Sequence, residues 1–170
     1  MRYKFIILDR DGVLNEIPTR NRYVLNENET VLKHEVIRNV VELQHQGVVF
    51  CVATNQKGIG LGLISVRDLE SIHDKLNTGL VDKGGKPIAF YVCSHIEGSC
   101  DCRKPKPGLL LKAMEDFKVT PAETLFIGDM LSDLLAAKNA YIDFMYVHNF
   151  TLMNVMSSKN LIKHYPEYLI

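Results

Sequence analysis

Four consecutive apolar residues near the start of the chain run into two aspartates and a glycine. Residues 5–8 contain no Gly or Pro, and Asp9, Asp11 and Gly12 follow them directly. Such a run is typical of a strand buried on both faces of a parallel sheet. Extended backbone sends the side chains of Asp9 and Asp11 to the same side. Two crowded carboxylates repel each other unless a cation or a proton intervenes. The alternative is an Asp-Gly turn that closes a hairpin, with both acids solvated.

Segments of strand length alternate with segments of helical periodicity along the chain. The expected strands are 3–8, 48–53, 89–92, 124–127 and 144–147. The expected helices are 35–45, 66–81, 108–117 and 131–140, with a last short helix at 160–165. This alternation favours an α/β fold, a Rossmann-like three-layer sandwich with a parallel sheet of about five strands. The polar segment 12–30 is expected to form a mobile flap loop or short hairpin over the first strand.

The bulk composition favours one cytosolic globular domain spanning residues 1–170. Lys plus Arg and Asp plus Glu both number 20, so the formal net charge is zero and no general affinity for nucleic acid or anionic membrane is indicated. The chain has no apolar run long enough for a membrane helix, and its N-terminus does not resemble a signal peptide. Four cysteines in the cytosol are expected to be thiols or metal ligands. A monomer is favoured.

Polar side chains follow two further predicted strands. Thr54 begins a Gly-containing turn, whose hydroxyl and backbone amides suit a phosphoryl group. Asp129 emerges from the strand at 124–127, and Asp133 follows it at the start of a helix. Lys104 lies in a basic loop that two prolines stiffen. Each signal also has a purely structural explanation. The turn after Thr54 could simply start a helix, and Asp133 could complement a helix dipole. The basic loop around Lys104 could simply be solvated.

Taken together, these side chains predict one phosphoryl-transfer site. Asp9 and Asp129 would hold Mg²⁺, which needs few carboxylates besides waters and phosphate oxygens. Thr54 and Lys104 would bind the phosphoryl oxygens, and Asp9 would attack phosphorus to form an aspartyl-phosphate. Asp11 would protonate the leaving alkoxide and then deprotonate water. That role requires a protonated Asp11 near neutral pH, which its negative neighbours favour.

The motif order Asp-x-Asp-Gly, Thr, Lys, Gly-Asp-x-x-x-Asp resembles the haloacid dehalogenase superfamily, specifically its phosphatases. The resemblance covers residues 3 to about 147. It implies that Asp9 is the nucleophile and that Asp11 is the acid/base residue, whose backbone carbonyl also binds Mg²⁺. It further implies that Asp129 is a metal ligand, and we place Asp133 behind it as a support rather than on the ion.

A second site is predicted by the spacing Cys-x-His-x₄-Cys-x-Cys. Its members are Cys93, His95, Cys100 and Cys102. Three thiolates and one imidazole are enough for a closed tetrahedral Zn²⁺ site, in which the ion would be structural and would stabilise the loop 93–102. The alternative is four unrelated residues in a surface loop.

The zinc loop followed by Arg103 and Lys104 resembles a narrower group, the heptose 1,7-bisphosphate phosphatases and the related histidinol-phosphate phosphatases. Residues 54–56 match that group too, which implies substrate-binding roles for Asn55, Gln56, Arg103 and Lys104. The spacing between the motifs leaves no room for a separate cap domain. The flap and the zinc loop are therefore expected to exclude water from the site.

Three functions remain open from the sequence. The leading one is a Mg²⁺-dependent phosphomonoesterase acting on a small sugar phosphate, most plausibly a heptose 1,7-bisphosphate. Histidinol-phosphate phosphatase is the enzymatic alternative. The third is a zinc-knuckle module that binds nucleic acid and carries degenerate phosphatase motifs, which the balanced charge and the lack of an aromatic and basic stripe disfavour.

Overall fold

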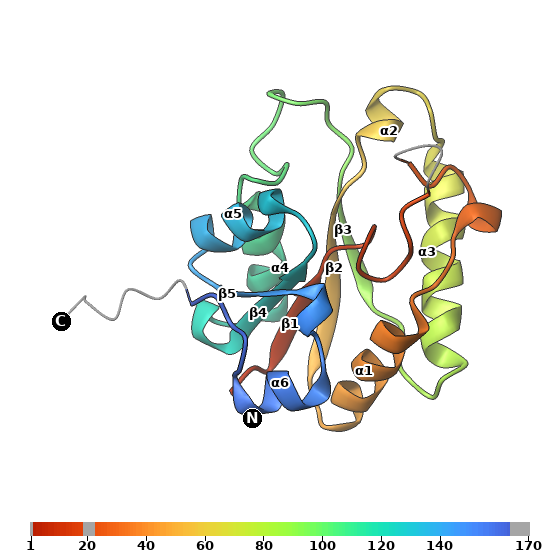
Figure 1. The fold of residues 1–170 in the computed structure, drawn as a ribbon. Coiled ribbons are helices and arrows are strands. Elements are labelled where there is room, and N and C mark those ends of the chain that lie inside the picture. Colours follow the sequence, from red (N-terminus) through yellow and green to blue (C-terminus); the bar gives the residue numbers. More distant parts are fainter. Residues whose placement is uncertain (1, 19–22, 164–170) are drawn as a thin grey trace.

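Residues 2–18 and 23–163 are described by the computed structural model of the chain, which is built around one parallel sheet (Figure 1). The strands are β1 (Phe5–Leu8), β2 (Val49–Asn55), β3 (Ala89–Cys93), β4 (Thr124–Gly128) and β5 (Asp143–Tyr146). Their order in the sheet is β3-β2-β1-β4-β5, and each neighbouring pair runs parallel. The predicted five-stranded α/β sandwich is therefore confirmed.

Helices cover both faces of this sheet. They are α1 (His34–His45), α2 (Lys57–Gly60), α3 (Val66–Val81), α4 (Gly108–Phe117), α5 (Leu131–Asn139) and α6 (Leu152–Ser157). Short 3₁₀ helices lie at Glu27–Glu29, Pro121–Glu123 and Val147–Asn149. Figure 1 shows α1 and α3 on one side of the sheet and α4 and α5 on the other.

The central strand β1 separates two apolar cores. Ile6 and Leu8 belong to the core formed with α1 and α3, whereas Phe5 and Ile7 belong to the core formed with α4 and α5. All four side chains are fully buried. A strand covered on both faces needs apolar residues at every position, which explains why the run has no polar alternation.

The register of β1 positions the residues that follow it. Leu8 pairs with Val52 of β2 on one side and with Ile127 of β4 on the other. The end of β1 therefore lies beside the end of β4, while β2 continues past it to Asn55. Asp9, at the end of β1, continues this alignment because its N–H donates to the carbonyl of Ile127 at 2.9 Å.

The segment 12–30 is a loop rather than a hairpin in its described parts. Its regular structure there consists of the 3₁₀ helix Glu27–Glu29 and two isolated bridges of Asn15, a parallel one to Asp11 and an antiparallel one to Leu32. The N–H of Glu16 also donates to the carbonyl of Val31 at 2.8 Å. Residues 19–22 lie outside the described residues. The loop is thus fixed at its base, next to the end of β1.

The prediction of a last helix at 160–165 is wrong for the residues described. The last helix is α6, where the Thr151 side chain accepts a hydrogen bond from the Asn154 N–H at 3.1 Å. Ile162 instead forms an antiparallel bridge with Phe144 of β5. Residues 164 and 165 fall outside the described residues.

Every strand of the described residues belongs to the one sheet, and no second sheet forms a cap over it. Within the same residues, no helix combines the length and the apolar character needed to cross a membrane.

Candidate active site

A cavity of about 350 Å³ lies at the carboxyl ends of β1, β2 and β4. It is lined by Asp9, Asp11, Ile17, Thr54, Asn55, Lys104, Asp129, Met130, Ser132 and Asp133. Ligands of open α/β sheets bind at this edge because the strand ends deliver side chains to one place. The structure thus brings together the residues that the separate motifs singled out.

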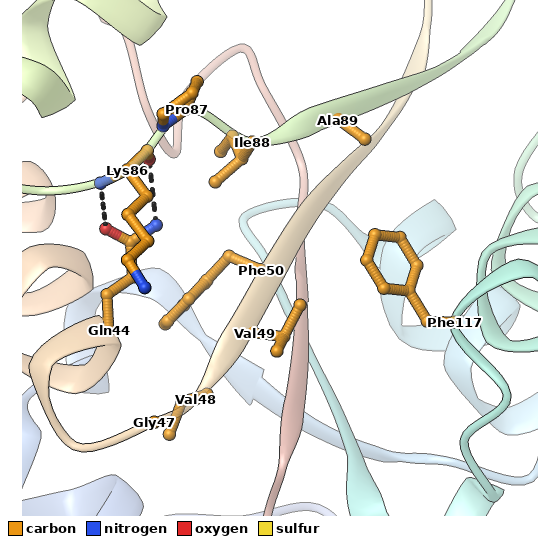
Figure 2. Close-up of a pocket in the computed structure, with 10 residues that line it drawn as sticks. All are labelled: Gln44, Gly47, Val48, Val49, Phe50, Lys86, Pro87, Ile88, Ala89 and Phe117. Carbon is orange, nitrogen blue, oxygen red and sulfur yellow. Dashed lines mark hydrogen bonds between the residues drawn. The ribbon is translucent and has the colours of Figure 1, made fainter.

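A second cavity of about 350 Å³ lies at the opposite end of the sheet, beside the starts of β2 and β3 (Figure 2). Its lining is mostly apolar, and Val49, Phe50 and Phe117 contribute to it. The Gln44 amide is already engaged there: its Nε2 donates to the Lys86 carbonyl at 3.0 Å, and its Oε1 accepts from the Lys86 N–H at 2.8 Å. This cavity offers no carboxylate, and the chemistry belongs to the first one.

Lys104 is a buried cation at the base of the active-site cavity. Its Nζ lies 2.8 Å from Asp9 Oδ1 and 2.7 Å from Asp133 Oδ1, and it donates to the Ala53 carbonyl at 2.8 Å. Burial alone would lower the pKa of Lys104, but the two carboxylates outweigh it and raise that pKa above its ordinary value. The ammonium is therefore charged at neutral pH and fixed in place.

The Asn55 side chain positions the backbone of Lys104. Its Nδ2 donates to the Lys104 carbonyl at 3.0 Å, and its Oδ1 accepts from the Lys104 N–H at 3.1 Å. This pair of bonds ties the end of β2 to the loop that carries the lysine. The substrate-binding role of Asn55 stays a prediction, because both ends of its amide already have partners.

Asp9 is the most buried carboxylate that follows a strand. Its Oδ1 accepts from the Arg10 N–H at 2.7 Å, and its residue exposure is 8%. Burial raises the pKa of Asp9 to about 7, and the positive charge of Lys104 opposes this rise. A second cation beside Asp9 would favour the ionised nucleophile further.

The residues Asp9, Asp129 and Asp133 fit a hard divalent cation. One carboxylate oxygen from each lies within 4.8 Å of the others. Among the described residues, the buried Asp129 Oδ1 has no hydrogen-bond partner. Burial first, and then the charge of Asp133, raises the pKa of Asp129. Carboxylate oxygens are ligands that Mg²⁺ takes, and the unpartnered Asp129 Oδ1 is available to bind such an ion.

Asp133 is held by its neighbours in this cluster. Its Oδ2 accepts from the N–H groups of Asp129 at 3.3 Å and of Met130 at 3.1 Å, and its Oδ1 faces Lys104. Its Oδ2 therefore has hydrogen-bond partners and its Oδ1 has an ion-pair partner, which is compatible with a supporting position behind the ion.

Gly12 allows the turn after β1 to approach Asp129. Its φ is +81°, and a Cβ atom there would lie 2.1 Å from Asp129 Oδ2. Any side chain would collide with the proposed metal ligand. Gly12 thus explains why a glycine follows the two aspartates.

The surroundings of Asp11 differ from the expectation of negative neighbours. The Arg10 guanidinium contacts both carboxylate oxygens, with Nη2 at 2.8 Å from Oδ1 and 2.9 Å from Oδ2. Asn15 Nδ2 donates to Oδ1 at 2.9 Å, and Gln56 Nε2 donates to Oδ2 at 2.8 Å. The predicted acid/base role of Asp11 stays a prediction; in this conformation N–H donors, rather than the expected acidic groups, surround its carboxyl group.

Gln56 links the two sides of the cavity. The same Nε2 that reaches Asp11 also lies 2.9 Å from Thr54 Oγ1, to which it donates. The Thr54 hydroxyl is thereby left to donate its own proton toward the cavity. Gln56 itself is buried and does not line the cavity. Its substrate-binding role stays a prediction.

Arg103 does not line the active-site cavity. Its Nη1 is buried and has no hydrogen-bond partner among the residues that the structure describes. The substrate contact predicted for Arg103 is therefore not shown by this conformation and stays a prediction.

The three cysteines and the histidine of the predicted zinc loop meet in one cluster. His95 Nδ1 lies 3.6 Å from Cys93 Sγ and 3.4 Å from Cys102 Sγ. Cys100 Sγ lies 3.6 Å from Cys93 Sγ and 3.4 Å from Cys102 Sγ. Four soft ligands at these separations are compatible with tetrahedral zinc, whose sulfur ligands lie about 2.3 Å from the ion.

Two residues of the site had not been assigned a role from the sequence. Arg10 stands between the two aspartates and is fully buried. A basic residue between two acidic ones, just after a buried strand, was the available signal. Lys33 donates from Nζ to the Gly12 carbonyl at 2.9 Å, and it had no motif to mark it.

Comparisons with known proteins agree with this geometry. The family described as haloacid dehalogenase-like hydrolase matches residues 4–147. The D-glycero-beta-D-manno-heptose-1,7-bisphosphate 7-phosphatase of Neisseria meningitidis is 37% identical over 134 residues, which are 78% of this chain and 71% of that protein. The D-glycero-alpha-D-manno-heptose-1,7-bisphosphate 7-phosphatase of Campylobacter jejuni is 34% identical over 149 residues, 88% of this chain and 84% of that protein.

A solved structure shows the same similarity. The D,D-heptose 1,7-bisphosphate phosphatase from B. bronchiseptica, complexed with magnesium and phosphate, superposes with a TM-score of 0.80 at 32% identity. The match covers 96% of this chain and 89% of that chain.

Proposed function

Because the chain belongs to the haloacid dehalogenase-like hydrolase family, we propose that it is a Mg²⁺-dependent phosphatase that hydrolyses D-glycero-D-manno-heptose 1,7-bisphosphate at its 7-phosphate. The observation that carries this proposal is the cavity in which Asp9, Asp129 and Lys104 meet at the strand ends. It has a buried nucleophile, an acidic cluster for a cation and a fixed positive charge within one cavity of about 350 Å³.

The first chemical step forms a bond between an Asp9 oxygen and phosphorus. The bond between phosphorus and the sugar oxygen breaks, and Asp11 gives a proton to the departing alkoxide. Thr54 donates a hydrogen bond to a phosphoryl oxygen, and Lys104 keeps a positive charge beside the nucleophile. Bound Mg²⁺, held by Asp9, Asp129 and the Asp11 backbone carbonyl, would supply positive charge for the phosphoryl oxygens.

The second step returns the enzyme to its starting state. Asp11, now a carboxylate, takes a proton from a water molecule as that water attacks phosphorus. The bond between Asp9 and phosphorus breaks, inorganic phosphate leaves, and Asp11 is again protonated. One water is consumed and one phosphate is released in each cycle.

The heptose substrate is supported by the relatives that match most of the chain. Their names include both the beta and the alpha anomer of the bisphosphate. Similarity therefore supports the heptose and the 7-position, and both anomers belong in the test. No comparable observation favours histidinol phosphate or a nucleic acid.

The two metal assignments rest on different ligand chemistry. Mg²⁺ is proposed for the carboxylate cluster, and the related structure with magnesium and phosphate supports it. Zn²⁺ is proposed for Cys93, His95, Cys100 and Cys102, where it would hold the loop in place.

Phosphate release tests the proposal. The purified protein with Mg²⁺ is assayed on both anomers of the heptose bisphosphate and on histidinol phosphate, with Asp9→Asn as the inactive control. We expect the highest kcat/KM on one of the two heptose anomers and no turnover by Asp9→Asn. Equal, poor rates on all three substrates would contradict the substrate assignment, and turnover by Asp9→Asn would contradict the nucleophile.

A further inference from the structure

Two large apolar residues, Ile17 and Met130, line the otherwise polar active-site cavity. Ile17 is 44% exposed and Met130 is 55% exposed, so much of their apolar surface is uncovered. The other lining residues carry carboxylate, hydroxyl, amide or ammonium groups. Apolar surface beside a few polar groups is typical of the wall of a small-molecule site, where a ligand covers it.

Backbone hydrogen bonds fix the two segments that carry these side chains. The Met130 N–H donates to Asp133 Oδ2 at 3.1 Å, and the Met130 carbonyl accepts from the Asp133 N–H at 3.0 Å. Ile17 follows Glu16, whose N–H donates to the Val31 carbonyl at 2.8 Å. The two apolar side chains therefore reach one cavity from separate places, the residue before α5 and the base of the flap loop.

The charges of the cavity lining suit one phosphate and an uncharged group beside it. Among the described residues, Lys104 is the one cation in the lining, and its Nζ already lies 2.8 Å from Asp9 Oδ1 and 2.7 Å from Asp133 Oδ1. The other charged residues of that lining are acids. A second anionic group drawn into the cavity would therefore meet carboxylates, which repel it.

We propose that Ile17 and Met130 form an apolar contact surface for the carbon chain of the substrate's ester group, beside the reacting phosphate. This inference rests on the proposed phosphatase function and names two specificity-determining residues for it. In a sugar phosphate, the surface would cover the C–H groups of the carbons nearest the ester oxygen. The site thus prefers substrates whose first carbons carry no further charged group.

A series of n-alkylphosphonates measures this contact without turnover. Each member keeps the charged phosphorus group and a P–C bond that the enzyme does not hydrolyse, and successive members add one methylene group. The affinity of each for the protein with Mg²⁺ is measured by titration calorimetry. From methyl- to butylphosphonate, we expect wild-type affinity to rise by about 2- to 4-fold per methylene, the upper value being that of full burial.

The double variant Ile17→Ser, Met130→Ser removes the apolar surface. Serine suits the position before a helix, so the start of α5 should be retained. We expect the gain in affinity per methylene to disappear in this variant. Leu131→Ser is the matched control, because Leu131 is 62% exposed, directly follows Met130 and does not line the cavity. It should keep the wild-type gain.

The outcomes separate this inference from the proposed function. Wild-type affinity that does not depend on chain length overturns the apolar surface, as does the absence of binding at every chain length. An unchanged gain in the double variant, or an equal loss of gain in Leu131→Ser, overturns the role of the two residues. If the double variant does not fold, an unchanged gain in both single variants has the same meaning. Because the readout is binding, failure of the heptose bisphosphate as a substrate leaves this test intact.

Discussion

At the scale of single residues, the candidate site depends on buried charges that neighbouring charged groups fix in place. Lys104 is charged because Asp9 and Asp133 raise its pKa against the effect of burial. A lysine held this way keeps its position before any phosphate arrives. Preorganised charge stabilises a transition state more effectively than charge that must first move.

Gly12 provides a sharp test of the metal cluster. Gly12→Ala would place a Cβ atom 2.1 Å from Asp129 Oδ2 at a φ of +81°. We expect Mg²⁺ affinity, measured by titration calorimetry, and phosphate release to fall by about 10-fold or more, since misplaced metal ligands typically cost that much.

The control for this variant is Gly62→Ala. Gly62 also has a positive φ, +69°, but a Cβ atom there would meet nothing within 4 Å. Both variants carry a similar backbone cost, of about 1 kcal/mol. Equal Mg²⁺ affinity in the two variants would show that contact with Asp129 is not what Gly12 avoids.

Side-chain orientation at the residue scale is what the sequence could not reveal. Strand periodicity predicted that Asp9 and Asp11 point the same way, and both do line one cavity. It could not predict that the Arg10 side chain would turn to Asp11, because rotamers depend on neighbours from β2 and α3. The same limit applies to Asn55 and Gln56, whose amides bond within the protein.

At the scale of elements, the strands were predictable from short apolar runs and the long helices from apolar residues that recur at helical spacing. Short elements were not. The segment 160–165 contains apolar residues, but Ile162 pairs with Phe144 rather than continuing a helix. The helix forms earlier, at α6, where Thr151 supplies the N-terminal cap.

Residues 95–99 of the zinc loop are exposed, so these residues are held by the four clustered ligands rather than by apolar burial. Cys102→Ser removes one of the four clustered ligands. We expect zinc content, measured by atomic emission, to fall from about one ion per chain toward zero and the melting temperature to fall with it, since metal binding stabilises such loops.

Cys51→Ala is the matched cysteine control. Cys51 is buried in β2, and burial raises the pKa of its thiol above the ordinary value, as expected for an unreactive core thiol. Its replacement should leave zinc content unchanged. A full complement of zinc in Cys102→Ser would contradict the assignment of that residue as a ligand.

At the scale of the whole molecule, the acidic cluster makes stability depend on pH and on Mg²⁺. In the metal-free protein, burial raises the pKa of Asp9 to about 7 from an ordinary 3.8. A raised folded-state pKa contributes stability at low pH that is lost as the pH rises through about 7. The folded state is therefore penalised most when Asp9 is ionised and has no metal.

This linkage predicts a pH-dependent effect of the metal. Mg²⁺ should raise the melting temperature more at pH 8 than at pH 5.5, because the ion binds the ionised cluster. Differential scanning fluorimetry with and without Mg²⁺ measures the shift, and Asp129→Asn should reduce it at pH 8. A larger shift at the lower pH would contradict the sign worked out here.

The architecture of the molecule concentrates every catalytic group at one edge of the sheet. The described residues form one sheet without a cap, so the flap loop and the zinc loop are the segments that remain to enclose a substrate. Covalent chemistry through Asp9 is the claim on which the proposed phosphatase mechanism depends.

Trapping the phosphorylated enzyme tests that claim most directly. Asp11→Asn slows hydrolysis of the intermediate, so the variant is mixed with p-nitrophenyl phosphate and Mg²⁺, quenched in acid and analysed by tandem mass spectrometry. The account predicts one phosphoryl group per chain, attached to Asp9 and absent from an Asp9→Asn, Asp11→Asn double variant. A phosphoryl group on any other residue, or release of p-nitrophenol without a phosphorylated protein, would contradict it.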